Sequence, residues 1–109
     1  MIDIDGYQNF TKQTAIYPKD KGLEYCTLGL AGEAGEVANK VKKIIRDSNG
    51  VINEETKKIL QSELGDVYWY LARLGDELNL KSSSIIEENV IKLSSRFERG
   101  VIQGSGDNR

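Results

Sequence analysis

Two stretches of this chain, LGLAGEAGEV at residues 28–37 and SELGDVYWY at residues 62–70, carry matched pairs of acidic residues. The pairs have the spacing E-x-x-E and E-x-x-D, and they are formed by Glu33, Glu36, Glu63 and Asp66. Residues three apart share one face of a helix, with about 5–6 Å between their Cβ atoms. The spacing therefore predicts two helices that, packed side by side, direct four carboxylates towards one small volume.

Four clustered carboxylates indicate a metal site. Holding so much like charge together is costly unless cations neutralise it. Hard divalent cations such as Mg²⁺ prefer oxygen ligands. The chain has no histidine, which excludes His-based nucleophilic catalysis and His-containing zinc or di-iron sites. Carboxylate chemistry with a hard cation is therefore the expected chemistry.

The length and charge of the chain exclude several classes of protein. Its 109 residues are typical of one domain with a modest core, so we expect a single helical domain over residues 1–109. The net charge of −2 gives no bulk attraction to a nucleic-acid polymer or to an anionic membrane. No apolar run approaches the roughly 20 residues of a membrane-spanning helix. Cys26 is the single cysteine, which favours a core position in a reduced, cytoplasmic protein.

Apolar residues recur at helical spacing, and the pattern predicts an all-α fold. We expect a first helix over residues 4–15 and a second over residues 21–46, followed by a turn at 47–50 (DSNG). Asn53 is the expected N-cap of a third helix, and Ser84 with Glu87 forms the expected capping box of a fourth. Residues 100–109 are glycine-rich and predict an irregular tail. The expected architecture is a four-helix bundle.

Both acidic pairs border the apolar stripe of their helix. At about 100° per residue, the first acid of each pair lies about 60° from the centre of the stripe and the second about 120°. If the two stripes pack together, the pairs meet at the rim of the interface. Either pair alone favours a solvated helix face, whereas two pairs in matching positions favour a site.

Cationic and amide side chains extend the polar edges of the same helices. Such lines can hold phosphate oxygens or a sugar, the alternative being a solvated face. They are formed by Lys40 and Lys43 on the second helix and by Asn89, Lys92 and Arg96 on the fourth.

Glycines interrupt the two acid-bearing helices, at Gly29, Gly32, Gly35 and Gly65. Each costs about 1 kcal/mol relative to alanine inside a helix. Close helix approach, or room for a ligand beside the carboxylates, would offset that cost.

The aromatic residues have different expected roles. Tyr68 and Trp69 lie outside the apolar stripe of the third helix, which favours an oligomer interface or a ligand platform. Tyr7, Phe10 and Tyr17 are expected to pack in the core, the alternative being that one of them stacks on a base.

At these motifs the chain resembles the MazG-type nucleoside triphosphate pyrophosphohydrolases. The similarity lies in LGLAGEAGEVANKVKK (28–43), ELGDVYWYLARL (63–74) and ENVIKLSSRFERG (88–100), and it continues into the terminal GSGDNR. The E-x-x-E and E-x-x-D patterns of that superfamily match the four acids, and its N-x-x-K-x-x-x-R pattern matches Asn89, Lys92 and Arg96. The short form is similar to stand-alone, phage-encoded members, which would act in the host cytoplasm.

The resemblance implies an all-α, MazG-like four-helix bundle that forms a homodimer or homotetramer. It implies hydrolysis of a (deoxy)nucleoside triphosphate between the α- and β-phosphates to a nucleoside monophosphate and pyrophosphate. The four acids would hold Mg²⁺, with Mn²⁺ as a substitute, and would be the catalytic residues. The substrate-binding residues would be Lys40, Lys43, Asn89, Lys92 and Arg96.

Two alternatives remain at this stage. One is a selective enzyme of the same superfamily that hydrolyses dUTP, dCTP or phosphoribosyl-ATP. The other is a non-catalytic helical interaction module, which the intact acidic pairs disfavour because a scaffold has little reason to cluster four acids.

Overall fold

A computed structural model describes residues 2–109, which form four α-helices and no β-strand. The helices are α1 (Ile4–Thr11), α2 (Gly22–Ser48), α3 (Glu54–Glu77) and α4 (Ser82–Glu98). Two 3-10 helices, Lys12–Thr14 and Lys19–Lys21, lie between α1 and α2. The predicted all-α fold with four helices is confirmed. Every helix in the described part of the chain is too short or too polar to span a lipid bilayer.

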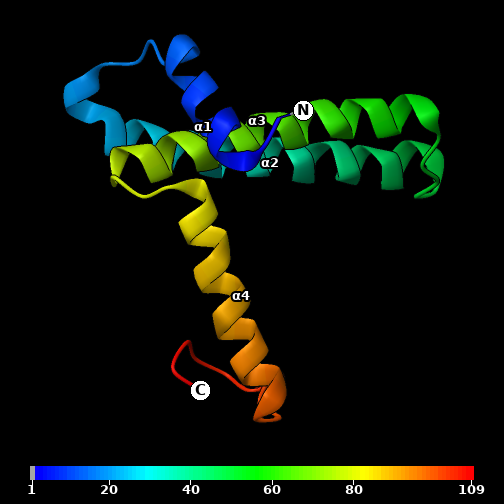
Figure 1. Ribbon diagram of the computed structural model, residues 1–109. Coiled ribbons are helices and arrows are strands. Elements are labelled where there is room, and N and C mark those ends of the chain that lie inside the picture. The colour runs from blue at the N-terminus through cyan, green and yellow to red at the C-terminus, as the bar shows by residue number, and fades with distance from the viewer. Residues whose placement is uncertain (1) are drawn as a thin grey trace.

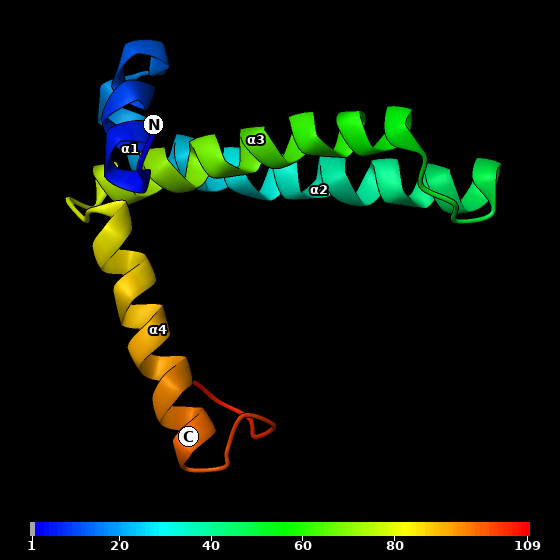
Figure 2. The same ribbon diagram turned by 45° about the vertical axis from the view of Figure 1, so that its right-hand side comes forward.

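Helices α2 and α3 form a long antiparallel hairpin, and they lie side by side in both views (Figures 1 and 2). The turn begins at Asn49, two residues later than predicted, where the left-handed φ of 52° ends α2. The predicted cap of α3 is confirmed. The Asn53 side chain accepts from the Thr56 amide at 2.9 Å, and the Thr56 hydroxyl accepts from the Asn53 amide at 3.0 Å.

Helix α4 points away from the hairpin, so the four helices of one chain do not close into a compact bundle (Figures 1 and 2). The radius of gyration is 16.9 Å, whereas a compact domain of this length would have about 13 Å. The apolar stripe of α4 is consequently exposed along its length, at Ile86, Val90, Leu93 and Phe97. Helix α3 likewise exposes Leu64, Tyr68 and Leu71 on a second apolar face.

The N-terminus of α4 is capped by side chains of α1. The expected capping box of Ser84 and Glu87 is wrong, because the N-cap of α4 is Lys81, three residues before Ser84, and it makes no side-chain cap. Instead, the Ser82 amide donates to Gln8 Oε1 at 2.8 Å and the Ser83 amide donates to Asp5 Oδ1 at 2.9 Å. A carboxylate at a helix N-terminus also interacts favourably with the helix dipole.

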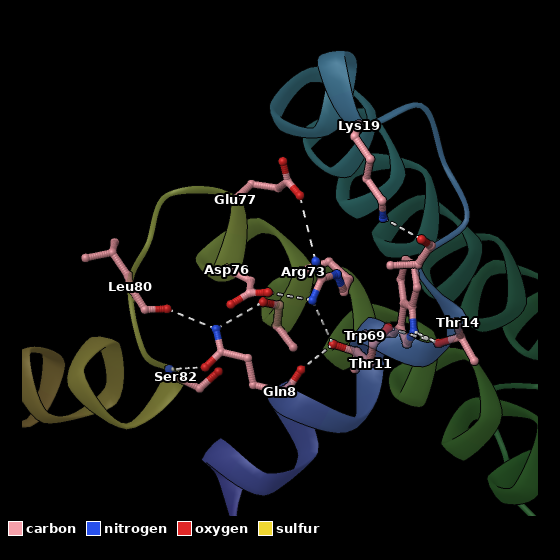
Figure 3. Close-up of polar contacts among 12 residues, drawn as sticks. Gln8, Thr11, Thr14, Lys19, Trp69, Arg73, Asp76, Glu77, Leu80 and Ser82 are labelled. Atoms are coloured by element: carbon pink, nitrogen blue, oxygen red, sulfur yellow. Dashed lines mark hydrogen bonds and ion pairs between the residues drawn. The ribbon is translucent and has the colours of Figure 1, made fainter.

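The buried face of α1 is polar, which the sequence pattern did not predict. Gln8 and Thr11 are buried, whereas Phe10 is 52% exposed. Gln8 Nε2 donates to the Ala72 carbonyl at 3.2 Å and to the Leu80 carbonyl at 2.9 Å, near the C-terminal end of α3 (Figure 3). Helix α1 is therefore held against α3 and the segment that follows it by side-chain hydrogen bonds to backbone carbonyls.

The core lies where the α1–α2 connection meets the open end of the hairpin. Cys26 is fully buried there, as predicted, together with Ala15 and Tyr17. Trp69, Tyr70 and Leu74 of α3 pack against this cluster.

Of Gly29, Gly32, Gly35 and Gly65, only Gly29 is explained by a contact within the described chain. A Cβ on Gly29 would overlap the ring of Tyr70, so this glycine allows the close approach of α2 and α3 that the sequence predicts. At Gly32, Gly35 and Gly65 an added Cβ would meet open space.

We expect Gly29→Ala to destabilise the protein by about 1–3 kcal/mol, because overpacking forces the Tyr70 ring to move. The matched variant Gly32→Ala should stabilise it by up to about 1 kcal/mol, because alanine has the higher helix propensity. Urea denaturation of both variants measures the difference. Equal effects at the two positions would contradict the close approach at Gly29.

A second prediction concerns the contact between α1 and α4. The hydrogen bonds from the Ser83 hydroxyl and amide hold the pKa of Asp5 below its ordinary value of 3.8. A carboxyl with a lowered pKa stabilises the fold above its ordinary pKa, and this contribution is lost as the pH falls through the lowered value. Asp5→Asn should therefore lower the Tm at neutral pH, and its deficit relative to wild type should shrink once the pH is below 3.8. Thermal unfolding followed by circular dichroism tests this, and a deficit that is constant with pH would contradict it.

Candidate metal centre

Three of the four predicted acids meet across the hairpin. Glu33 of α2 and Glu63 and Asp66 of α3 each offer one carboxylate oxygen, and these atoms lie within 4.8 Å of one another. Glu33 and Glu63 are partly buried and Asp66 is exposed. The group thus lies at the rim of the interface between α2 and α3, as the helical wheels predict.

Glu36 lies one turn further along α2 and outside this group of three, although its charge acts on the group. Burial raises the pKa of the Glu33 carboxyl, and the charges of Asp66, Glu63 and Glu36 raise it further. The four acids therefore repel one another at the site.

The site fits a hard divalent cation. Its donors are carboxylate oxygens, which suit Mg²⁺ and Mn²⁺ rather than softer metals. Among the residues that the structure describes, no ion pair involves any of the four acids. A bound cation would therefore offset the repulsion among the acids, which contributes to the raised pKa of Glu33.

Lys40 and Lys43 line a different cavity from the acids. Their cavity lies towards the turn of the hairpin and also includes Asp47 and Thr56. Neither lysine lines the cavity beside Glu33 and Asp66. Their predicted contact with phosphate stays a prediction.

The structure does not bring the polar line of α4 to the acids of the same chain. Asn89, Lys92 and Arg96 lie on the helix that points away from the hairpin (Figure 2). Arg96 is buried, and its Nη2 donates to the Asp107 carbonyl at 2.7 Å. Lys92 Nζ lies 3.8 Å from the Asp107 carboxylate. Within one chain, the partner of these two cations is the C-terminal tail.

The tail is irregular, as predicted, and it is held in place by hydrogen bonds. The Arg109 guanidinium donates to the carbonyls of Val101, Ile102 and Gly106. Arg99 Nη2 donates in turn to the Arg109 carbonyl at 2.6 Å. Arg109 therefore folds back on the end of α4.

Aromatic residues complete the surroundings of the acids. The cavity beside Glu33 and Asp66 is also lined by Phe10, Thr14, Trp69 and Tyr70. The sequence marked Trp69 as a candidate ligand platform, and its position three residues after Asp66 places both on one side of α3. Thr14 was missed, because a threonine in a short connection carries no distinguishing signal.

Comparisons with known proteins agree with these motifs. The MazG nucleotide pyrophosphohydrolase domain matches residues 21–101, which span α2, α3 and α4. The chain is 54% identical over 114 residues to the Gene 37 protein of Mycobacterium phage L5, and the match covers 99% of this chain and 100% of that protein. No solved structure matches the chain. The extent of the domain match shows that the chain belongs to the MazG nucleotide pyrophosphohydrolase family.

Proposed function

We propose that this protein hydrolyses (deoxy)nucleoside triphosphates to nucleoside monophosphates and pyrophosphate in a Mg²⁺-dependent reaction. Family membership supports nucleotide pyrophosphohydrolase activity in general. The observation that carries the finer proposal is the group of three carboxylate oxygens within 4.8 Å, contributed by two adjacent helices. A triphosphate carries several negative charges, so a site made of acids requires cations between itself and the substrate.

The family generally depends on divalent metals, and the acids offer suitable ligands. Glu33, Glu63 and Asp66 would hold Mg²⁺, and Glu36 would complete the set. When bound there, Mg²⁺ would neutralise charge on the triphosphate and on the developing transition state. Mn²⁺ would substitute because it has a similar preference for oxygen ligands.

The reaction adds water across the phosphoanhydride bond between the α- and β-phosphates. A carboxylate of the cluster would orient the attacking water and accept its proton. Lys40 and Lys43 follow Glu36 on α2 and would attract the remaining phosphate charge.

Substitution of Glu63 tests the reaction. We expect Glu63→Gln to lower kcat by about 10²–10³-fold with Mg²⁺ and a dNTP, because losing a metal ligand removes several kcal/mol of transition-state stabilisation. The matched variant Glu24→Gln, which changes an exposed acid in the first turn of α2, should keep full activity. Anion-exchange chromatography identifies the products. Release of orthophosphate, or full activity of Glu63→Gln, would contradict the proposal.

We also propose that the protein acts as a homodimer or homotetramer. The single chain exposes 8170 Å², whereas a compact protein of 12.2 kDa would expose about 6,100 Å². The excess is accompanied by the exposed apolar stripes of α3 and α4. Contiguous apolar faces of this kind are typical of surfaces that a partner covers.

A charge in the middle of the α4 stripe tests the assembly. Light scattering should give the wild type a mass two or four times that of the 12.2 kDa chain. Val90→Asp should reduce this mass, because a buried unpaired charge in an interface is strongly unfavourable. The control Ser84→Asp adds the same charge at an exposed position about 120° around α4 from Val90, outside the stripe, and should leave the mass unchanged. A wild type that runs as a monomer would refute the proposal.

A further inference from the structure

The far end of α4 is positively charged, although the whole chain carries a net charge of −2. Between residues 92 and 109, four cationic side chains accompany two acidic ones. The cations are Lys92, Arg96, Arg99 and Arg109, and the acids are Glu98 and Asp107. A local excess of positive charge attracts anions. This end of the molecule therefore has the charge that an anionic ligand requires.

One anion of the chain itself lies on two of these cations. The Asp107 carboxylate lies 3.4 Å from Arg96 Nη2 and 3.8 Å from Lys92 Nζ. Both distances exceed the roughly 2.7–2.9 Å of a well-formed hydrogen bond between a cationic nitrogen and a carboxylate. The Asp107 side chain is also 87% exposed, and exposed ion pairs stabilise a fold only slightly. Asp107 is thus a loosely held anion that a stronger one can replace.

Arg96 has donors that Asp107 does not use. Its side chain is 6% exposed, because the tail (residues 100–109) covers it. Within residues 2–109 its side-chain hydrogen bonds are made by Nη2 alone, to the carbonyl of Asp107 at 2.7 Å and to the carboxylate of the same residue. A guanidinium has five N–H donors. Further N–H groups of Arg96 therefore remain for an anion with more oxygens than a carboxylate.

The tail that carries Asp107 has a defined fold, and it turns back beside the end of α4 (red in Figure 1). The Arg109 guanidinium donates to the Val101 carbonyl at 2.9 Å and closes the tail into a loop. A Cβ on Gly104 would overlap the Arg109 side chain, and Gly106 has a φ of 81°, which favours glycine. These features fix the backbone that places Asp107 on α4. Arg109 is therefore a positioning residue for this contact.

We propose that the Asp107 carboxylate holds the place of a phosphate group on Lys92 and Arg96, and that a polyphosphate binding to these cations displaces the tail. The proposal rests on the proposed function, because it takes the nucleoside triphosphate as the source of the phosphate group. A phosphate group has more acceptor oxygens and more charge than a carboxylate, so it binds the same cations more tightly. Since two anions at one site repel each other, the bound phosphate drives Asp107 away. The tail thus competes with the substrate and lowers its affinity.

Hydrogen exchange followed by mass spectrometry tests the displacement directly. The probe is inorganic tripolyphosphate without divalent metal, so that the acids of α2 and α3 repel it. Ligands ordinarily protect the amides that they cover, whereas displacement of the tail should speed exchange over residues 101–109 by about 5-fold or more. Unchanged or slower exchange of the tail at the highest tripolyphosphate concentration would overturn the proposal.

Asp107→Asn tests the competition. Removing the competing anion should lower KM for dNTPs about 2–5-fold without changing kcat, the factor that corresponds to one exposed ion pair. The control Glu98→Gln removes an acid from the same end of α4 that makes no ion pair in the described part of the chain, and it should keep the wild-type KM. Equal values of KM for the two variants would overturn the competition.

Arg109→Gln tests the positioning role. Without the guanidinium the tail should exchange quickly even in the absence of tripolyphosphate, and KM should fall as it does in Asp107→Asn. Because both residues would act through one contact, the double variant should have the KM of the Asp107→Asn variant. A KM in the double variant that falls by the product of the two single effects would contradict this role.

The tail and the reaction can be tested separately. Faster exchange of the tail with tripolyphosphate, in a protein that does not hydrolyse dNTPs, would support the displacement and remove the proposed reaction. Hydrolysis of dNTPs by Asp107→Asn at the wild-type KM would remove the competition by the tail and leave the reaction.

Discussion

The fold depends on one buried charge, the guanidinium of Arg73. This α3 side chain is 4% exposed. Its Nη1 donates to Asp76 at 2.9 Å and to the Thr11 hydroxyl at 3.3 Å, and its Nη2 donates to the Tyr17 hydroxyl at 3.2 Å. Burial alone would lower the pKa of Arg73, but the hydrogen bonds to Tyr17 and Asp76 raise it. Because a buried charge that loses its partners costs about 3–5 kcal/mol, α1 and its connection to α2 are held in place on α3.

Gln8 and Asp5 extend this arrangement to α4. Helix α1 accepts the Arg73 hydrogen bond through Thr11 and also caps the first turn of α4. Its Gln8 side chain donates to one carbonyl of α3 and to one in the segment between α3 and α4. The direction of α4 is therefore set by its contacts with α1 and with the end of α3, since α4 does not pack along the length of the hairpin (Figure 2). Helix α1 also places Phe10 at the cavity beside the acids. The hydrogen bonds of α1 therefore help to position both α4, with its exposed apolar stripe, and the aromatic side of the candidate site.

The acidic site was predictable from the sequence because it depends on local periodicity. Spacing within each helix placed Glu33, Glu63 and Asp66 at the edge of an apolar stripe, and packing α2 against α3 brought them within 4.8 Å. The hydrogen bonds of Gln8 were not predictable, because they reach residues 64 and 72 positions away, and a buried glutamine has no periodic signature. For the same reason the cap of α4 was misplaced, since its acceptors come from α1 rather than from its own first turn.

The apolar stripe of α4 shows what helical periodicity measures. Ile86, Val90, Leu93 and Phe97 recur with the regularity of a buried face, yet within one chain they remain exposed. An apolar stripe predicts that one face of a helix is buried, but it does not specify whether the same chain or another chain buries it. The same reasoning applies to Asn89 and Lys92, which flank that stripe. If another copy of the chain covers α4, these two side chains can lie near the acids of that copy although they are far from the acids of their own chain. Their contact with the site would then depend on how the chains assemble.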